Sequence, residues 1–257
     1  MIALIESLHP DIAKQQAQKS IRYGGIAIFP VIVLALLFSL FHLGKPLHAF
    51  KAIFNLGNAM LSLEILAFII IGALALVYSY MWWKAPDNRL RRPIGWMLSI
   101  AGFIGIVISA NVYTLPARLA WDSWETVAAF LTTTILLGSV TVASLLAGVE
   151  EQQKAQRTLG IVVLAGVVGS VAILAGIASM YGDSPEQSAF VVGTFASGMF
   201  FMRLLGSLAL PAAAAVSLFG KQPSKALLKV TLVAVVLGEL IGRILFYSAT
   251  MGQAPWF

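Results

Sequence analysis

The sequence contains no cysteine and only three histidines among its 257 residues. Without cysteine it forms no disulfide and offers no thiolate ligand for a structural zinc ion or an iron–sulfur cluster. Haem inside a membrane protein commonly needs axial histidines, and none of His9, His42 and His48 lies deep within an apolar run. The sequence therefore predicts no haem, no iron–sulfur cluster and no other metal site in this protein.

Charged residues are also scarce. They make up 11% of the chain, against roughly 25% in an ordinary soluble domain, whereas 59% of the residues are hydrophobic. A soluble core of this size cannot bury so much apolar surface, so the lipid bilayer must be the solvent for much of the protein. The net charge of +6 is spread over short segments between apolar runs and forms no basic face, which argues against nucleic acid as a partner.

Seven apolar runs are long enough to cross a membrane as helices, for which about 20 residues suffice. The runs are continuously apolar and do not alternate in polarity, which favours helices over a β-barrel. We therefore expect an all-α, polytopic transmembrane helix bundle with spans at 23–41, 61–83, 93–115, 126–148, 159–181, 191–219 and 226–248. Residues 1–22 lack the apolar core of a signal peptide and are expected to form a cytoplasmic segment before one helical domain at 23–257.

Lysine and arginine predict the orientation of these spans. With the N-terminus in the cytoplasm, the outer connections hold only Lys45, Lys51 and Arg118. The inner connections then hold Lys14, Lys19, Arg22, Lys84, Arg89, Arg91, Arg92, Lys154, Arg157, Lys221 and Lys225. Because basic residues accumulate on the cytoplasmic side, the C-terminus and the connection at 42–60 are expected outside.

Two ionisable residues lie at the edges of neighbouring spans. His42 follows the first span and Glu64 lies about one turn into the second, so both are expected near the outer membrane face. An imidazole and a carboxylate at this depth can accept protons from a bound molecule. The structural alternatives are a helix-capping role for His42 and an interfacial carboxylate that reaches towards water for Glu64.

Three further charged residues lie well inside the last two spans, whereas Lys229 lies close to the start of the last one. Glu239 and Arg243 are four residues apart, so they share one helix face and are expected to neutralise each other. Gly238 and Gly242 have the same spacing on an adjacent face, where another helix can approach closely. Arg203 interrupts the sixth span, and we expect it to pair with a nearby carboxylate.

The third connection contains the stretch AWDSWET, in which Asp122 lies between two tryptophans. Trp121 and Trp124 are typical of the aromatic belt at a membrane surface, whereas Asp122 is placed to help cover a site. Polar residues thus gather in the outer half of the expected bundle. A carboxylate and an imidazole beside an apolar slot suit a quinol, a lipid-soluble carrier of two electrons and two protons.

Four stretches, taken in order, resemble the membrane-anchor subunit family of bacterial dimethyl sulfoxide reductase: SLFHLGKPLHAF, LSLEIL, AWDSW and GELIGRILFY. The resemblance implies an anchor in the bacterial cytoplasmic membrane that carries no haem and oxidises menaquinol in anaerobic respiration. It also implies two partners, an iron–sulfur electron-transfer subunit and a molybdopterin catalytic subunit. The anchor itself is then a non-catalytic part of the oxidoreductase complex.

The residues of the family's quinol site can be placed on this sequence through these stretches. The histidine and glutamate of that site fall on His42 and Glu64, and Lys45 in HLGKP is a further candidate. Additional candidate contacts of the quinol are Asp122, Arg203, Glu239 and Arg243. The family has eight helices, so we expect this protein to lack the family's first span.

Two other functions stay open at the level of the sequence. A secondary transporter would use Arg203, Glu239 and Arg243 to line a substrate path, although no inverted repeat or pair of broken helices supports this reading. A purely structural anchor would tether an enzyme without binding quinone.

Overall fold

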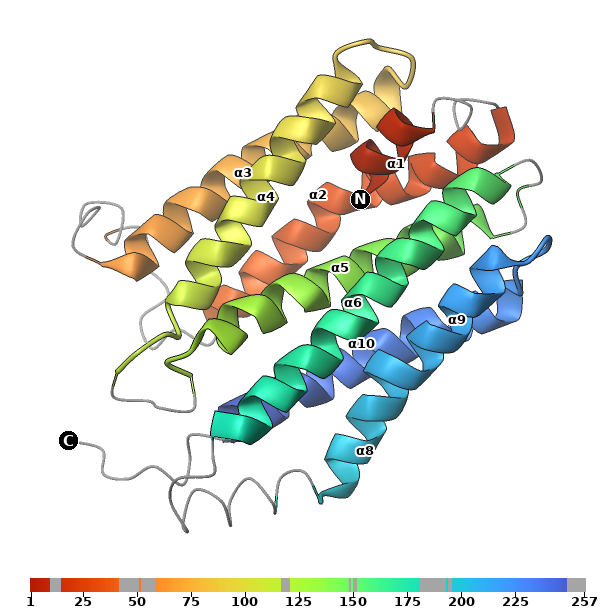
Figure 1. Ribbon diagram of the computed structural model, residues 1–257. Coiled ribbons are helices and arrows are strands. Elements are labelled where there is room, and N and C mark those ends of the chain that lie inside the picture. Colours follow the sequence, from red (N-terminus) through yellow and green to blue (C-terminus); the bar gives the residue numbers. More distant parts are fainter. Residues whose placement is uncertain are drawn as a thin grey trace. The chain divides into compact units, whose positions relative to one another are not determined.

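All regular structure in the described part of the protein is helical, which confirms the all-α prediction. The computed structural model describes residues 1–9, 15–41, 51, 59–116, 121–147, 149, 152–180, 193 and 196–248. Contacts divide the protein into two compact units, Met1–Val112 and Tyr113–Phe257, called unit 1 and unit 2 below. Figure 1 labels the helices of both units, and each unit is described by itself.

Unit 1 contains four helices, which are α1 (Ile2–Leu8), α2 (Gln15–Phe41), α3 (Met60–Lys84) and α4 (Arg91–Asn111). α3 packs against both α2 and α4, and the short α1 lies against α4. The three long helices are each apolar enough to cross a membrane. Segment 1–22, expected as a polar N-terminal extension, thus includes α1 and the beginning of α2, while its separation as a domain stays a prediction.

Unit 2 supplies four more membrane-spanning segments. They are α5 (Trp124–Leu146), α6 (Gln153–Met180), a composite segment from Gly198 to Phe219, and α10 (Lys225–Ser248). The composite segment consists of α8 (Gly198–Leu204), a π-helical turn η3 (Leu205–Ala209) and α9 (Leu210–Phe219). α6 packs against α5 and α9, and α10 packs against α5, α8, η3 and α9. Their core consists of Leu136, Val140, Val163, Ala215 and Val235.

The seven spans are confirmed, but some of their ends differ from the sequence-based bounds. α6 begins at Gln153, six residues before the expected start, because the helical backbone continues through polar residues outside the apolar run. α4 ends at Asn111, before the expected 115; Pro116 disfavours a helical conformation only for Leu115 and does not explain the end at Asn111.

α2 and α3 are joined by a close contact that depends on two small residues. The Ser79 hydroxyl on α3 donates to the Gly25 carbonyl at 2.9 Å and accepts from the Phe29 amide at 3.1 Å, so it links two backbone groups of α2. A Cβ atom at Gly25 would lie 2.2 Å from the Trp82 ring. Glycine at this position therefore lets the Trp82 ring lie directly on α2.

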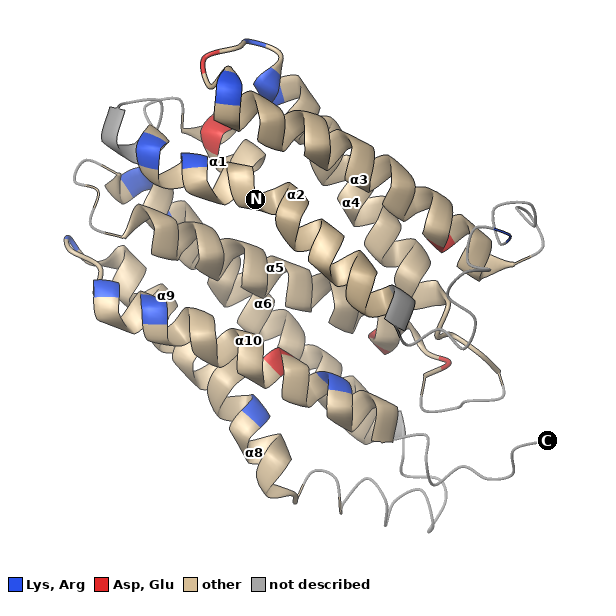
Figure 2. Ribbon diagram, turned by 180° about the vertical axis from the view of Figure 1, so that it is seen from behind, with Lys and Arg blue, Asp and Glu red and all other residues tan. Residues whose placement is uncertain are grey.

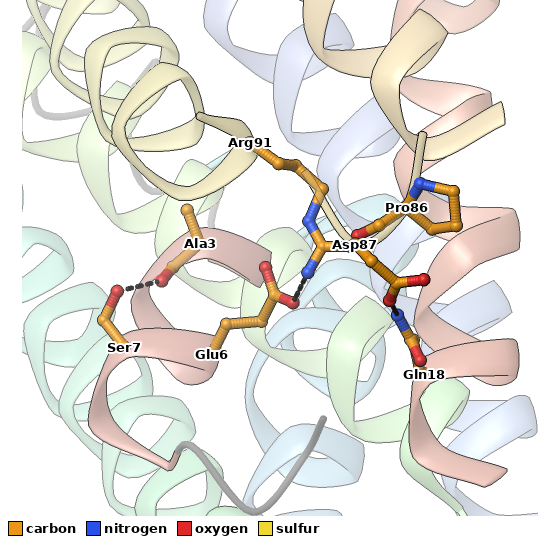
Figure 3. Close-up of polar contacts among 7 residues, drawn as sticks. All are labelled: Ala3, Glu6, Ser7, Gln18, Pro86, Asp87 and Arg91. Atoms are coloured by element: carbon orange, nitrogen blue, oxygen red, sulfur yellow. Dashed lines mark hydrogen bonds and ion pairs between the residues drawn. The ribbon is translucent and has the colours of Figure 1, made fainter. Parts of the chain in front are cut away.

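One end of unit 1 is held together by buried charge. The Arg91 guanidinium at the start of α4 donates to the Glu6 carboxylate on α1 at 2.7 Å and lies 3.7 Å from the Trp82 ring centroid. Burial raises the pKa of Glu6, while the charges of Arg91 and Arg92 partly offset this effect. Figure 3 shows this ion pair beside a hydrogen bond from Gln18 to Asp87.

The helix surfaces are suited to lipid. In unit 1, Lys, Arg, Asp and Glu gather mainly at the end where α1 lies, and the long stretches of the helices between the two ends are largely free of them (Figure 2). Large apolar side chains on the outward faces are exposed, for example Phe38 at 73% and Phe103 at 58%. Such faces are stable against acyl chains and costly in water, so they support the assignment of these helices as membrane spans.

Candidate functional site

Glu64 lies one turn into α3, near the end of unit 1 opposite the Arg91–Glu6 pair. Its carboxylate oxygen Oε1 accepts a hydrogen bond of 2.5 Å from the hydroxyl of Ser109, two residues before the end of α4. The side chain is only partly buried. Among the described residues, no donor contacts the second oxygen Oε2.

The other candidates for the outer site fall into two groups. His42 and Lys45 lie outside the described residues, so their predicted proximity to Glu64 stays a prediction. Asp122, Arg203, Glu239 and Arg243 belong to unit 2 and are described there.

Glu239 and Arg243 lie on one face of α10, and both are directed towards α5. The Glu239 carboxylate accepts a hydrogen bond of 2.6 Å from the Thr133 hydroxyl. The Arg243 guanidinium lies 3.6 Å from the centroid of the Phe130 ring, in a cation–π contact. The shared face expected from the four-residue spacing is therefore present. However, Glu239 and Arg243 form no direct ion pair, because each of them contacts a different residue of α5.

Arg203 lies on α8, and its side chain passes over Gly242 of α10. A Cβ atom at Gly242 would come within 2.8 Å of the Arg203 Nε atom. One turn further along, a Cβ atom at Gly238 would lie 2.6 Å from the Ser207 hydroxyl. The close helix approach predicted at Gly238 and Gly242 is confirmed. Within the described ranges no carboxylate pairs directly with Arg203, so the carboxylate partner expected for it is not found there.

The stretch before α5 contributes an aromatic cluster to unit 2. The Trp121 ring stacks on Phe246 with centroids 4.9 Å apart, and its indole nitrogen donates to the Phe246 carbonyl at 2.8 Å. The Tyr113 and Tyr247 hydroxyls are 2.8 Å apart. Trp121 is thus packed against α10, whereas Trp124 is 66% exposed, as a tryptophan of an interfacial belt would be. Asp122 is exposed.

Sequence reasoning missed the residues that hold these charged groups in place. Ser109 and Thr133 carry the hydroxyls that contact the two carboxylates, and Phe130 carries the ring under Arg243. Thr133 had a visible signal, since three consecutive threonines at 132–134 interrupt an apolar run. Ser109 and Phe130 had none, because serine and phenylalanine are common in spans and their partners depend on how the helices pack.

The Glu64 site in unit 1 and the charged group in unit 2 allow different chemistry. Glu64 can accept a proton while Ser109 fixes its orientation, which suits proton transfer at the end of a span. Glu239, Arg203 and Arg243 form a charged group with aromatic neighbours, which suits packing or binding more than proton transfer. No group of metal-ligating side chains is present among the described residues.

Comparison with known proteins identifies the family. Residues 3–249 match the family described as "DMSO reductase anchor subunit (DmsC)". The protein is 30% identical over 226 residues to the YnfH subunit of an anaerobic dimethyl sulfoxide reductase of Escherichia coli (strain K12), covering 84% of this protein and 78% of that one. It is also 30% identical over 257 residues to the C subunit of the anaerobic dimethyl sulfoxide reductase of the same organism, covering 94% and 86%. No solved structure matches this protein. It therefore belongs to the family of dimethyl sulfoxide reductase anchor subunits.

Proposed function

We propose that this anchor subunit oxidises menaquinol at a site formed around Glu64 and passes the electrons to an iron–sulfur subunit. The observation that carries the proposal is the Glu64 carboxylate, which sits one turn inside a membrane span with one oxygen held by Ser109. An ionisable side chain at this depth is costly and usually functional. Membership of the anchor family favours this role over the transporter alternative.

Quinol oxidation releases two electrons and two protons, so the site must supply proton acceptors. In this proposal Glu64 takes one proton from a ring hydroxyl of the quinol. The Ser109 hydroxyl donates to Oε1 and thereby directs the other carboxylate oxygen towards the ring. His42, which the sequence places at the same membrane face, takes the second proton or binds the second ring oxygen. Lys45 is a further candidate contact.

The partners and location follow from the same proposal. Both relatives are named as parts of an anaerobic dimethyl sulfoxide reductase. We infer that this protein likewise assembles with an iron–sulfur subunit and a molybdopterin catalytic subunit in the cytoplasmic membrane of a bacterium. The distribution of lysine and arginine supports an N-terminus in the cytoplasm and an external C-terminus.

Binding of a quinol-analogue inhibitor to the assembled complex tests the site separately from turnover. Glu64→Gln keeps the size of the side chain but removes its negative charge, and we expect the inhibitor to bind at least several-fold more weakly. Asp87→Asn is the matched control, since Asp87 is an exposed carboxylate just beyond the other end of α3. Equal inhibitor affinity in wild type and Glu64→Gln would place the quinol elsewhere.

A further inference from the structure

The end of unit 1 where α2 begins and α3 ends carries an excess of positive charge (Figure 2). The basic side chains described there are Lys19, Arg22, Lys84, Arg89, Arg91 and Arg92, and the acidic ones are Glu6 and Asp87, so six positive and two negative formal charges sum to +4. Asp11 and Lys14, in the connection from α1 to α2, lie outside the described residues, and their formal charges cancel. Because Glu6 is paired with the buried Arg91, the excess belongs to exposed and half-buried side chains.

One exposed face of α3 leads to this positive end. Ile69, Leu76, Tyr80 and Trp83 are 50%, 50%, 56% and 55% exposed, and their spacings of seven, four and three residues place them on the same side of the helix. Lys84 ends this row, with its Nζ atom 4.0 Å from the centroid of the Trp83 ring. We call these five residues the α3 stripe. Along it the side chains change from apolar to aromatic to cationic.

Arg22 of α2 adds a second cation at the end of the α3 stripe. Its guanidinium donates to the Trp82 carbonyl at 3.1 Å and to the Trp83 carbonyl at 2.8 Å, two groups that have no partner within the helix. Arg22 and Lys84 thus both contact Trp83, one at its carbonyl and the other at its ring. A guanidinium carries five N–H donors, so Arg22 keeps donors for a further acceptor.

Both cations can be reached from outside the protein. Lys84 is exposed and Arg22 is half-buried, and Tyr23 beside Arg22 is 75% exposed. The acidic residue nearest to Lys84 in the sequence is Asp87, whose carboxylate accepts a hydrogen bond of 3.0 Å from Gln18 (Figure 3). Among the described residues, no carboxylate forms an ion pair with Arg22 or Lys84. An anion from outside the chain can therefore bind to both.

We propose that Arg22 and Lys84 bind the phosphate of an anionic phospholipid whose acyl chains lie along the α3 stripe. The guanidinium and the ammonium donate charge-assisted hydrogen bonds to phosphate oxygens. Tyr80 and Trp83 then lie at the level of the lipid's polar–apolar boundary, where such amphipathic rings are favoured, and the apolar residues beyond them contact the acyl chains. The excess of positive charge selects an anionic over a zwitterionic lipid. Glu64 lies twenty residues before Lys84, about 30 Å away along α3, so this site is independent of the proposed quinol site.

The test is lipid binding by the purified full-length protein. After delipidation in detergent, the protein is titrated with phosphatidylglycerol or phosphatidylcholine, and native mass spectrometry gives the affinity for the first bound lipid. Wild type should prefer phosphatidylglycerol. Lys84→Gln should weaken its binding about fivefold, the effect of one basic residue near an anionic surface, whereas Lys84→Arg should bind nearly as wild type does. Arg92→Gln is the control, because Arg92 is an exposed basic residue at the same end of unit 1 but lies on α4.

Three results would overturn the proposal. Equal affinity of wild type for the two lipids would exclude a site for anionic lipid, and this result needs no variant. Equal losses in Lys84→Gln and Arg92→Gln would show that binding follows the overall charge of this end and not the α3 stripe. Displacement of phosphatidylglycerol by inorganic phosphate at equal concentration would identify a phosphate site that does not select lipid. The quinol proposal is unaffected by each of these results, because the test measures lipid binding alone.

Discussion

At the scale of single residues, two carboxylates inside spans, Glu64 and Glu239, each have a hydroxyl partner from a neighbouring helix. Ser109 contacts Glu64 in unit 1, and Thr133 contacts Glu239 in unit 2. Such a hydrogen bond lowers the cost of a carboxylate in a poorly solvated place and fixes its orientation. For Glu64 we interpret the orientation as functional, since no described donor contacts its second oxygen.

Removal of the Ser109 hydroxyl tests this orientation. We expect Ser109→Ala to slow quinol oxidation about tenfold or more, because a hydrogen bond to a charged group contributes about 1.5–3 kcal/mol. Ser109→Thr retains a hydroxyl and should keep most of the activity. Ser99→Ala is the control, since the Ser99 hydroxyl on the same helix donates only to the Gly95 carbonyl. Steady-state rates with a soluble quinol would settle the point, and wild-type rates in Ser109→Ala would remove Ser109 from the site.

The partners of Arg243 can be ranked by double-mutant cycles. The cation–π contact predicts coupling of about 0.5–2 kcal/mol between Arg243→Gln and Phe130→Leu. Because Arg243 and Glu239 form no direct ion pair, the coupling between Arg243→Gln and Glu239→Gln should be smaller. Thermal unfolding of the assembled complex gives both values. Stronger coupling between Arg243 and Glu239 would support the ion pair that their spacing suggests.

At the scale of elements, the sixth span and α10 pack with almost no space between their backbones. A Cβ atom at Gly206 in the π-helical turn would lie 2.5 Å from the Ala234 carbonyl oxygen of α10. π-helical turns inside α-helices are often associated with functional sites. Here the turn lies between α8 and α9 and follows α8 directly. α8 carries Arg203.

Substitution of Gly206 tests the importance of this contact. Gly206→Ala requires the backbones to move apart, and overpacking of this kind costs about 1–3 kcal/mol. We expect a lower unfolding temperature and a smaller yield of assembled complex. Gly102→Ala is a suitable control, since a Cβ atom there meets nothing within 4 Å and alanine favours the helix. Equal stability of the two variants would show that η3 and α10 are not tightly packed.

At the scale of the whole molecule, the spans and several residue positions follow from the sequence. Long apolar runs predict seven membrane helices, and the glycine spacing on α10 predicts a close helix contact. The π-helical turn has no sequence signal, and the helical start of α6 lies in polar residues. Side-chain partners were the least predictable, because Thr133 and Phe130 meet α10 only through the packing of α5.

The orientation of the protein in the membrane is itself a testable prediction. A reporter fused after Gln153 should respond as cytoplasmic and a reporter fused after Gly252 as external, because basic residues are concentrated in the connections expected inside. The opposite response would place Glu64 at the cytoplasmic face and would contradict a quinol site at the outer surface.

Quinol-dependent reduction of the partner's iron–sulfur clusters tests the central claim most directly. Wild type, Glu64→Gln and His42→Phe complexes would be compared by stopped-flow absorbance with menaquinol, after confirming equal assembly. The loss of a positioned proton acceptor usually slows a reaction by about 10²–10⁴, so both variants should reduce the clusters at least tenfold more slowly. Asp87→Asn should match wild type. Normal reduction rates in fully assembled Glu64→Gln and His42→Phe would contradict the account and leave the protein as a structural anchor or with its quinol site elsewhere.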